Sequence, residues 1–294
     1  MHTAAALPLP FAPRAADRPA RAHAAGSRRD AGLPPLKAFA ADLQTVTQVQ
    51  RIAAPLLPLL TLAAFVALCT LRLYALLPLA TVAHFIAITA FTHDVAHGTA
   101  GLGRKASDWV LFVVSIAMLE SGHAFRYSHL HHHSHCMEED DLEGAPALGT
   151  LAEALLGGPG YLARLGLAAY RRSPSRRERR WMLAELAGCI AMVFIALLLV
   201  RVSAIPLAYL AMMWLGSWLY PVTTAWLPHY RPAAHALGQS RTLRGRIVPA
   251  LFLNLTYHLE HHLYPQVPGA NLHLLAERLD PYFAERGVRP VQAF

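Results

Sequence analysis

Three histidine clusters border long apolar stretches of this chain. They read HDVAH at residues 93–97, HLHHH at residues 129–133 and HLEHH at residues 258–262. On a helix, side chains three and four residues apart project from one side, so each cluster can direct two or three imidazoles at one point. Imidazole binds iron, zinc, copper and nickel alike. The spacing therefore predicts a metal site and leaves the identity of the metal open.

The number of histidines predicts two metal ions, because eight exceed the ligands that one ion takes. The expected ligands are His93, His97, His129, His132, His133, His258, His261 and His262. A carboxylate or amide that accepts the second ring N–H can orient a ligating histidine; Asp94, Asp140, Asp141, Glu260 and Asn254 are expected to support the ligands in this way. By contrast, we expect His131 and His135 to be solvated and His84 to be buried without a metal.

Composition places these clusters in a membrane protein. The chain has 294 residues, of which 55% are hydrophobic and 15% charged, and its mean hydropathy is +0.33. A spanning helix needs about 20 apolar residues. This predicts an all-α fold with four spans in two hairpins, at residues 52–70, 75–92, 181–200 and 205–227. The apolar stretch 109–119 is too short to cross, and we expect an interfacial helix there with a cap at Ser107–Asp108.

Charge predicts the orientation. The two turns between spans carry little charge, whereas the other connections are basic, so both termini and all three clusters are expected on the cytoplasmic side, in a helical cap on a cytoplasmic membrane. Membrane topology explains the net charge of +8 better than nucleic acid binding does.

We expect a disordered leader rich in Ala, Pro and Arg at residues 1–47, a membrane domain at 48–280 and a tail at 281–294. The three cysteines predict no disulfide framework or CxxC metal site.

At these residues the chain resembles the membrane fatty acid desaturase superfamily, whose members share one HxxxH and two HxxHH boxes. The first box continues as HDVAHG, acidic residues 138–141 follow the second, and the third lies within NLTYHLEHHLYPQVP at 254–268. The resemblance covers about residues 50–280. It implies a non-haem di-iron centre that uses O2, with the eight box histidines as iron ligands. A further histidine after the fourth span is common in such proteins, and His229 is the best candidate, followed by His235.

The resemblance implies a lipid substrate, and we favour desaturation of a fatty acyl chain. A carotenoid ketolase or hydroxylase and a fatty acyl hydroxylase of the same superfamily remain open. A membrane metal transporter is the alternative from another class, but it requires ionisable residues along a path through the spans, where only His84 and Glu185 stand. The sequence contains no haem, iron–sulfur or dinucleotide motif, so an external ferredoxin, rubredoxin or cytochrome is the expected electron donor. The basic residues 171–180 could steer such a partner.

Overall fold

The protein is mostly helical in a computed structural model, which describes residues 31–233 and 235–294. Its helices are α1 (Gln48–Thr70), α2 (Leu77–His97), α3 (Arg104–Met118), α4 (Gly122–Ser134), α5 (Leu151–Arg172), α6 (Arg176–Leu199), α7 (Ile205–Ser217), α8 (Leu227–His229), α9 (Ile247–Leu251), α10 (His258–Leu263) and α11 (Leu272–Glu285). Short helices are η1 (Leu36–Ala38), η2 (Ala41–Gln44), η3 (Tyr74–Leu76), η4 (Ala145–Leu148), η5 (Pro221–Trp226), η6 (Ala236–Gly238) and η7 (Gly269–Asn271). Two strands, β1 (Leu243–Arg244) and β2 (Val291–Gln292), complete the chain.

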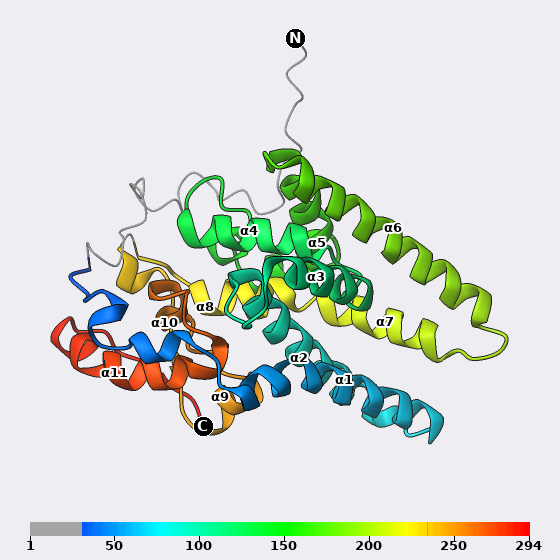
Figure 1. The fold of residues 1–294 in the computed structure, drawn as a ribbon, viewed down its shortest axis with the longest axis horizontal. Coiled ribbons are helices and arrows are strands. Elements are labelled where there is room, and N and C mark those ends of the chain that lie inside the picture. Colours follow the sequence, from blue (N-terminus) through cyan, green and yellow to red (C-terminus); the bar gives the residue numbers. More distant parts are fainter. Residues whose placement is uncertain (1–30, 234) are drawn as a thin grey trace, which may run out of the picture.

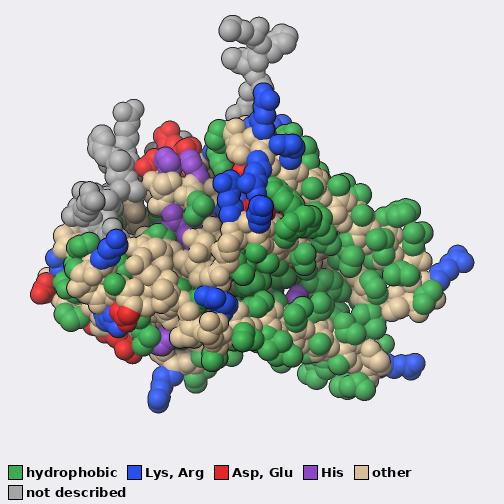
Figure 2. Space-filling view, viewed as in Figure 1, with side chains coloured by type: hydrophobic (Ala, Val, Ile, Leu, Met, Phe, Trp, Pro, Cys, Tyr) green, Lys and Arg blue, Asp and Glu red, His purple; other side chains and the backbone are tan. Residues whose placement is uncertain are grey.

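Four helical segments are long and apolar enough to cross a membrane, as expected from the sequence. They are Ala41–Thr70, Tyr74–His97, Arg176–Leu199 and Ile205–His229. In Figure 1 the helices α1, α2, α6 and α7 extend toward one side of the molecule. Hydrophobic side chains gather over that side, whereas most histidine and acidic side chains visible in Figure 2 lie at the other end. This division suits a bundle whose outer surface faces lipid.

Polar contacts and aromatic packing hold the spans together. The ring of Phe65 on α1 packs edge-on against Tyr209 of α7, with centroids 5.6 Å apart. His84 of α2 is buried, and its two ring nitrogens lie 2.9 Å from the hydroxyls of Thr61 and Tyr209. Both ring nitrogens are therefore hydrogen-bonded inside the bundle, as burial in an apolar medium requires. The structure thus places His84 in a structural contact, as expected.

The helix expected at residues 109–119 begins earlier and continues into a bent pair. α3 starts at Arg104, and its axis makes an angle of 105° with that of α4. The predicted cap at Ser107–Asp108 is wrong, because both residues lie buried inside α3 and Gly103 is the N-cap. The Asp108 carboxylate instead accepts from Arg126 of α4 at 3.1 Å. This buried ion pair joins the two helices near the histidine-bearing turn.

Residues 31–47 pack against the far end of the chain. Leu36, Ala40 and Leu43 are buried in one core with α11, and the Asn271 amide donates to the carbonyl of Leu43 at 3.0 Å. Residues 31–47, which belong to the expected disordered leader, are therefore folded against α11, because their apolar side chains pack on a surface that the sequence did not reveal. Residues 1–30 of the leader lie outside the described residues.

The expected tail is also integrated into the fold. α11 continues to Glu285, and β2 pairs in parallel with β1, with Leu243 opposite Val291. The carbonyl of Phe294 accepts from the amides of Ile247 at 2.9 Å and Val248 at 3.1 Å. The tail thus fixes the start of α9, which follows β1.

Candidate metal centre

The three histidine clusters converge from α2, α4 and α10 and form two adjacent groups. The first group contains His93, His97, His129, His133 and His261, and the second contains His132, His229, His262 and the thiol of Cys136. His258 joins the second group, because its Nε2 atom lies 2.8 Å from Nε2 of His229. All eight box histidines and His229 therefore lie in one compact region.

On each of the three helices, histidines four residues apart share a group. On α4, His129 and His133 lie in the first group while His132 faces the second; on α10, His258 and His262 belong to the second group while His261 faces the first. Residues four apart stand on nearly the same helix face, whereas the residue three positions on is rotated away. Each HxxHH box thus supplies both groups rather than one point.

The first group is closely packed around its imidazole nitrogens. Nε2 of His261 lies 2.9 Å from Nε2 of both His93 and His133, and Nε2 of His133 lies 3.2 Å from that of His129. Nε2 of His97 is buried and has no hydrogen-bond partner within the described residues. Each neutral imidazole has one donor and one acceptor nitrogen, so nitrogens that face each other in this way cannot all be hydrogen-bonded to one another. A cation at their centre could accept the lone pairs of all of them.

The second group is built around His229, at the end of the span Ile205–His229. Its Nε2 atom lies 3.2 Å from Nε2 of His132, and its Nδ1 atom is 2.9 Å from the Gln239 carbonyl oxygen. α8, which ends at His229, directly follows the π-helical turn η5. Pro221 and Pro228 lack the N–H of a regular helix, and the wider turn ends the span at this histidine.

Carboxylates lie behind two of the histidines. Asp141 Oδ2 is 2.7 Å from Nδ1 of His132, and Glu143 Oε1 is 2.7 Å from Nδ1 of His129. Burial disfavours the charged form of His132, but the Asp141 carboxylate outweighs it and raises the pKa of His132. Burial raises the pKa of Glu143 to about 7. These contacts fix the Nε2 atoms toward the interior of the two groups.

Glu143 and Cys136 did not stand out in the sequence. Glu143 lies two residues beyond the acidic residues 138–141 that follow the second box, so its position just after this run is the signal that could identify it. The Cys136 Sγ atom is 3.9 Å from Nδ1 of His229, although no paired cysteine spacing signals it. Burial raises the pKa of the Cys136 thiol well above its usual range. The thiol is therefore kept protonated by its surroundings.

The other expected supporting residues make different contacts. Asp140 pairs with His131 at 3.0 Å, and Glu260 accepts from Arg244 at 2.7 Å. Asn254 does not share the helix face of His258, because α10 begins at His258 and Asn254 has a positive φ of 65°. Its amide lies 3.5 Å from His273 instead.

Asp94 lies close to its neighbour in the chain and to a distant loop. Its Oδ1 atom is 3.6 Å from Nδ1 of His93, and the same carboxylate accepts from the amide of Gly269 at 3.0 Å. It therefore ties the end of α2 to the loop that follows α10. Of the remaining histidines, the rings of His131 and His135 stack at 4.2 Å, outside both groups. The side chain of His235 contacts neither group in the described residues.

Imidazole protonation also suits a metal. Burial, reinforced by neighbouring imidazoles, lowers the pKa values of His129, His133, His258, His261 and His262 well below the usual range. These side chains are thus neutral near pH 7, which is the form that binds metal. Nine histidine nitrogens with carboxylate support fit two transition-metal ions, and the near absence of thiolate or exposed carboxylate in the groups fits iron among others.

An apolar cavity of about 300 Å³ has four of the histidines in its wall and extends along α2, whose residues from Thr81 to His93 line it. Its inner wall includes His93, His129, His258 and His261. Its far wall lies between α2 and α7, at Thr81, Phe85 and Gly216 among others. A cavity of this shape can hold an apolar chain with one carbon beside the metal groups.

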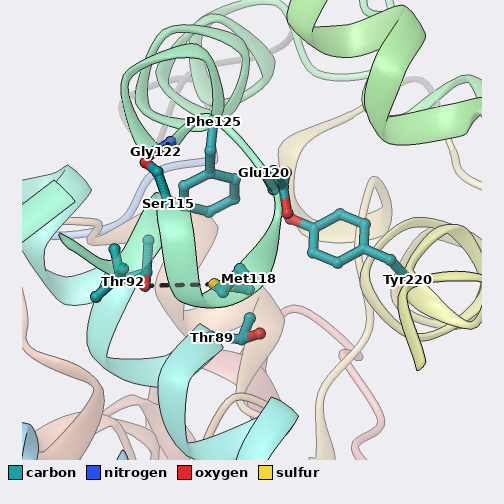
Figure 3. A pocket seen from close by; sticks show the side chains of 9 residues that line it. Thr89, Thr92, Ser115, Met118, Glu120, Gly122, Phe125 and Tyr220 are labelled. Atoms are coloured by element: carbon teal, nitrogen blue, oxygen red, sulfur yellow. Dashed lines mark hydrogen bonds between the residues drawn. The ribbon is translucent and has the colours of Figure 1, made fainter. Parts of the chain in front are cut away.

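A small side chamber adjoins this cavity. Thr89, Phe125 and Tyr220 line both spaces, and the chamber beyond them holds the partly buried carboxyl of Glu120. Figure 3 shows the Tyr220 ring directed toward Glu120, and a contact of 3.8 Å between Thr92 and Met118 on the opposite wall. Loss of hydration, with smaller contributions from Glu143 and Glu185, raises the pKa of Glu120 to about 8. Its carboxyl is therefore mostly protonated at neutral pH.

Comparison with known proteins agrees with this geometry. A family model described as "Fatty acid desaturase" matches residues 67–293. The match covers well over half of the chain and includes all three histidine boxes and His229. No curated protein matches the chain.

Proposed function

The chain belongs to the fatty acid desaturase family, and we propose from this premise that it is a membrane-bound di-iron enzyme that uses O2 to desaturate a lipid acyl chain. The observation that carries the proposal is the position of the histidine groups, which form the inner end of an apolar cavity. An acyl chain supplies no polar handle near its reacting carbons. Shape and apolar contact must therefore orient it.

The eight box histidines and His229 are proposed to hold two iron ions. When bound, iron at this site would activate dioxygen and supply the oxidant that an unactivated C–H bond requires. The protein's own contribution is to position and shield the reaction. Asp141 and Glu143 fix His132 and His129, while Phe85, Phe125 and other apolar side chains exclude water and align the chain.

The topology belongs to the same proposal. We place the four spans in two hairpins within a membrane domain at residues 48–280, with both termini and the histidine groups on the cytoplasmic side. Electrons then come from a soluble ferredoxin, rubredoxin or cytochrome. The arginines at residues 171, 172, 176, 177, 179 and 180 surround the α5–α6 turn and would steer an acidic donor.

A metal transporter is less compatible with the contacts inside the spans. Among the described residues, the buried ionisable side chains His84 and Glu185 are both engaged. His84 bonds to Thr61 and Tyr209, while Glu185 bonds to Ser121 and His123 at 2.5 Å. A transport path needs polar groups that are free to exchange an ion. These contacts support the enzyme instead.

The test compares wild-type protein with His261→Ala in membranes that receive purified ferredoxin, its reductase and NADPH. Lipids and added carotenoid are analysed by mass spectrometry. Acyl chains lighter by two hydrogens, formed only by the wild type and only with O2, would support desaturation. Acyl products heavier by one oxygen would favour the hydroxylase, and an oxygenated carotenoid the ketolase or hydroxylase. The assay is repeated with rubredoxin and with a reduced cytochrome, and iron-loaded protein that yields none of these products with any of the three donors would refute the proposal.

A further inference from the structure

The apolar cavity reaches the outer surface of the helix bundle. Its wall includes Val82 of α2, Leu219 before η5 and Leu227 of α8, and these three side chains are also among the exposed large hydrophobic residues. A residue that is both exposed and part of the cavity wall marks the place where the cavity opens. The opening therefore lies on the apolar flank of the spans rather than on a charged surface.

The loop that contains α9 forms the neighbouring wall of this opening. Val248, Phe252 and Leu255 line the cavity, whereas Ile247 and Leu251, on the outer face of α9, are 59% and 64% exposed. We call Ile247 and Leu251 the entry patch. The amide of Arg241, just before β1, donates to the carbonyl of Pro228 at 2.8 Å, so this loop is fastened to the end of the span Ile205–His229.

The end of the span to which the α9 loop is fastened has the composition of a membrane interface. The rings of Trp226 and Tyr230 pack at an angle of 38°, with centroids 4.6 Å apart, at the end of the span. The guanidinium groups of Arg231 and Arg241 lie about 5 Å from the Tyr230 ring. Arg246 is exposed directly before the patch. Aromatic rings and basic side chains next to exposed aliphatic residues are typical of the lipid headgroup region.

The depth of α9 agrees with this environment. In Figure 1 α9 lies at about the same level, along the long axis of the bundle, as the start of α1. Since α1 begins at Gln48 and runs along the apolar side, that level corresponds to the boundary between the spans and the rest of the protein. Ile247 and Leu251 exposed at this level would meet headgroups and the first acyl carbons.

We propose that the entry patch lies in the headgroup region of the bilayer and that the lipid substrate enters the cavity beside it, directly from the membrane. The entry step rests on the proposed function, whereas the membrane contact does not.

Two consecutive residues behind the patch, Leu253 and Asn254, have positive φ values of 50° and 65°. This left-handed backbone turns the chain back, so that Phe252 and Leu255 reach the cavity while Leu251 points outward.

The membrane contact is tested by spin labelling of the full chain in nanodiscs of phosphatidylethanolamine and phosphatidylglycerol. Cysteines are introduced singly as Ile247→Cys and Leu251→Cys in a Cys189→Ser background, since Cys69 and Cys136 are buried. Glu285→Cys at the exposed end of α11 is the matched control. We expect labels at the patch to relax more with O2 than with a water-soluble nickel complex, and the control label to show the reverse.

Labels at Ile247 and Leu251 that behave like the label at Glu285 would overturn the proposal, because the patch would then face water. Protection from both O2 and nickel would also overturn it, because a protein partner would then cover the patch. These results require no turnover. The membrane contact can therefore succeed or fail separately from the desaturase activity.

The entry step is tested by kinetics with lipid substrate in the same nanodiscs. Leu251→Glu should raise KM about tenfold at unchanged kcat, because removing one apolar anchor costs about that factor. Leu274→Glu on α11, an exposed leucine outside the cavity wall, is the control and should leave KM unchanged. If the spin label at residue 251 shows membrane contact but Leu251→Glu and Leu274→Glu have the same KM, then the substrate does not enter beside the patch.

Discussion

At the residue scale, the two histidine groups give each imidazole a distinct position. His97, His132 and His261 come from three different helices; His97 and His261 lie in the first group and His132 lies in the second. We expect His97→Ala, His132→Ala and His261→Ala each to abolish turnover while the protein still inserts in membranes, because each removes a nitrogen that no neighbouring side chain can replace. Product analysis by mass spectrometry, together with membrane fractionation, measures both properties.

The matched controls for these variants are His131→Ala and His135→Ala. Both residues belong to or follow the second box, but their rings stack on each other outside the two groups. They should retain substantial activity. Retained activity in two of the three variants within the groups would contradict the di-iron assignment.

Glu143 provides a second prediction at this scale. Its carboxylate accepts from His129 at 2.7 Å, and Glu143→Gln keeps the shape while removing the charge that holds the ring. Loss of such a contact typically lowers metal affinity or activity about 10–100-fold. Iron content after dialysis against a chelator, measured by mass spectrometry, should therefore fall in Glu143→Gln and stay at the wild-type level in Glu285→Gln. Equal iron retention would show that the contact does not hold the metal.

At the element scale, close packing between α5 and the residues after α7 fixes the wall of the cavity. A Cβ atom added at Gly158 of α5 would lie 2.3 Å from the carbonyl oxygen of Trp218. Because backbone must move to relieve this clash, Gly158→Ala should destabilise the protein by about 1–3 kcal/mol. The melting temperature in detergent is the measurement.

Gly166, two turns further along α5, is the control because no atom lies within 4 Å of its added Cβ. Gly166→Ala should be neutral or slightly stabilising, since alanine favours a helix over glycine. If Gly158→Ala melts at the same temperature as Gly166→Ala, then the contact between α5 and Trp218 has room for a methyl group.

At the scale of the whole molecule, the partly buried carboxyl of Glu120 contributes to the dependence of stability on pH. The pKa of Glu120 is about 8 in the fold, against 4.5 for a free glutamate. An acid whose pKa rises on folding contributes its full stability below the unfolded pKa and loses it as pH rises through the folded value. The melting temperature of the wild type relative to that of Glu120→Gln should thus fall between about pH 5 and pH 8.

Glu120→Gln should lack this one contribution, because the amide stays neutral throughout the range. The comparison is a series of melting temperatures in detergent from pH 5 to pH 9, with Glu277→Gln, an exposed residue of α11, as the control. Parallel curves for wild type and Glu120→Gln would show that the carboxyl is hydrated in the folded protein.

The sequence by itself determined the helical membrane class, the four apolar segments and the histidines that come together. These features are local, because a run of about 20 apolar residues or an i, i+4 pair depends only on helix geometry. The family likewise followed from the three boxes and was confirmed by the match over residues 67–293. Orientation in the membrane and the ligand roles stay predictions.

Only the tertiary structure decided how the histidines divide into two groups, because that depends on how α2, α4 and α10 face one another. It also decided that Glu143 supports His129, that Asn254 lies beside His273, and that residues 31–47 pack on α11. These contacts join segments whose partners no spacing rule identifies. The cavity and its opening are likewise products of packing, since their walls combine α2, η5 and the loop around α9, which are far apart in the chain and meet only when the helices close around a shared apolar space.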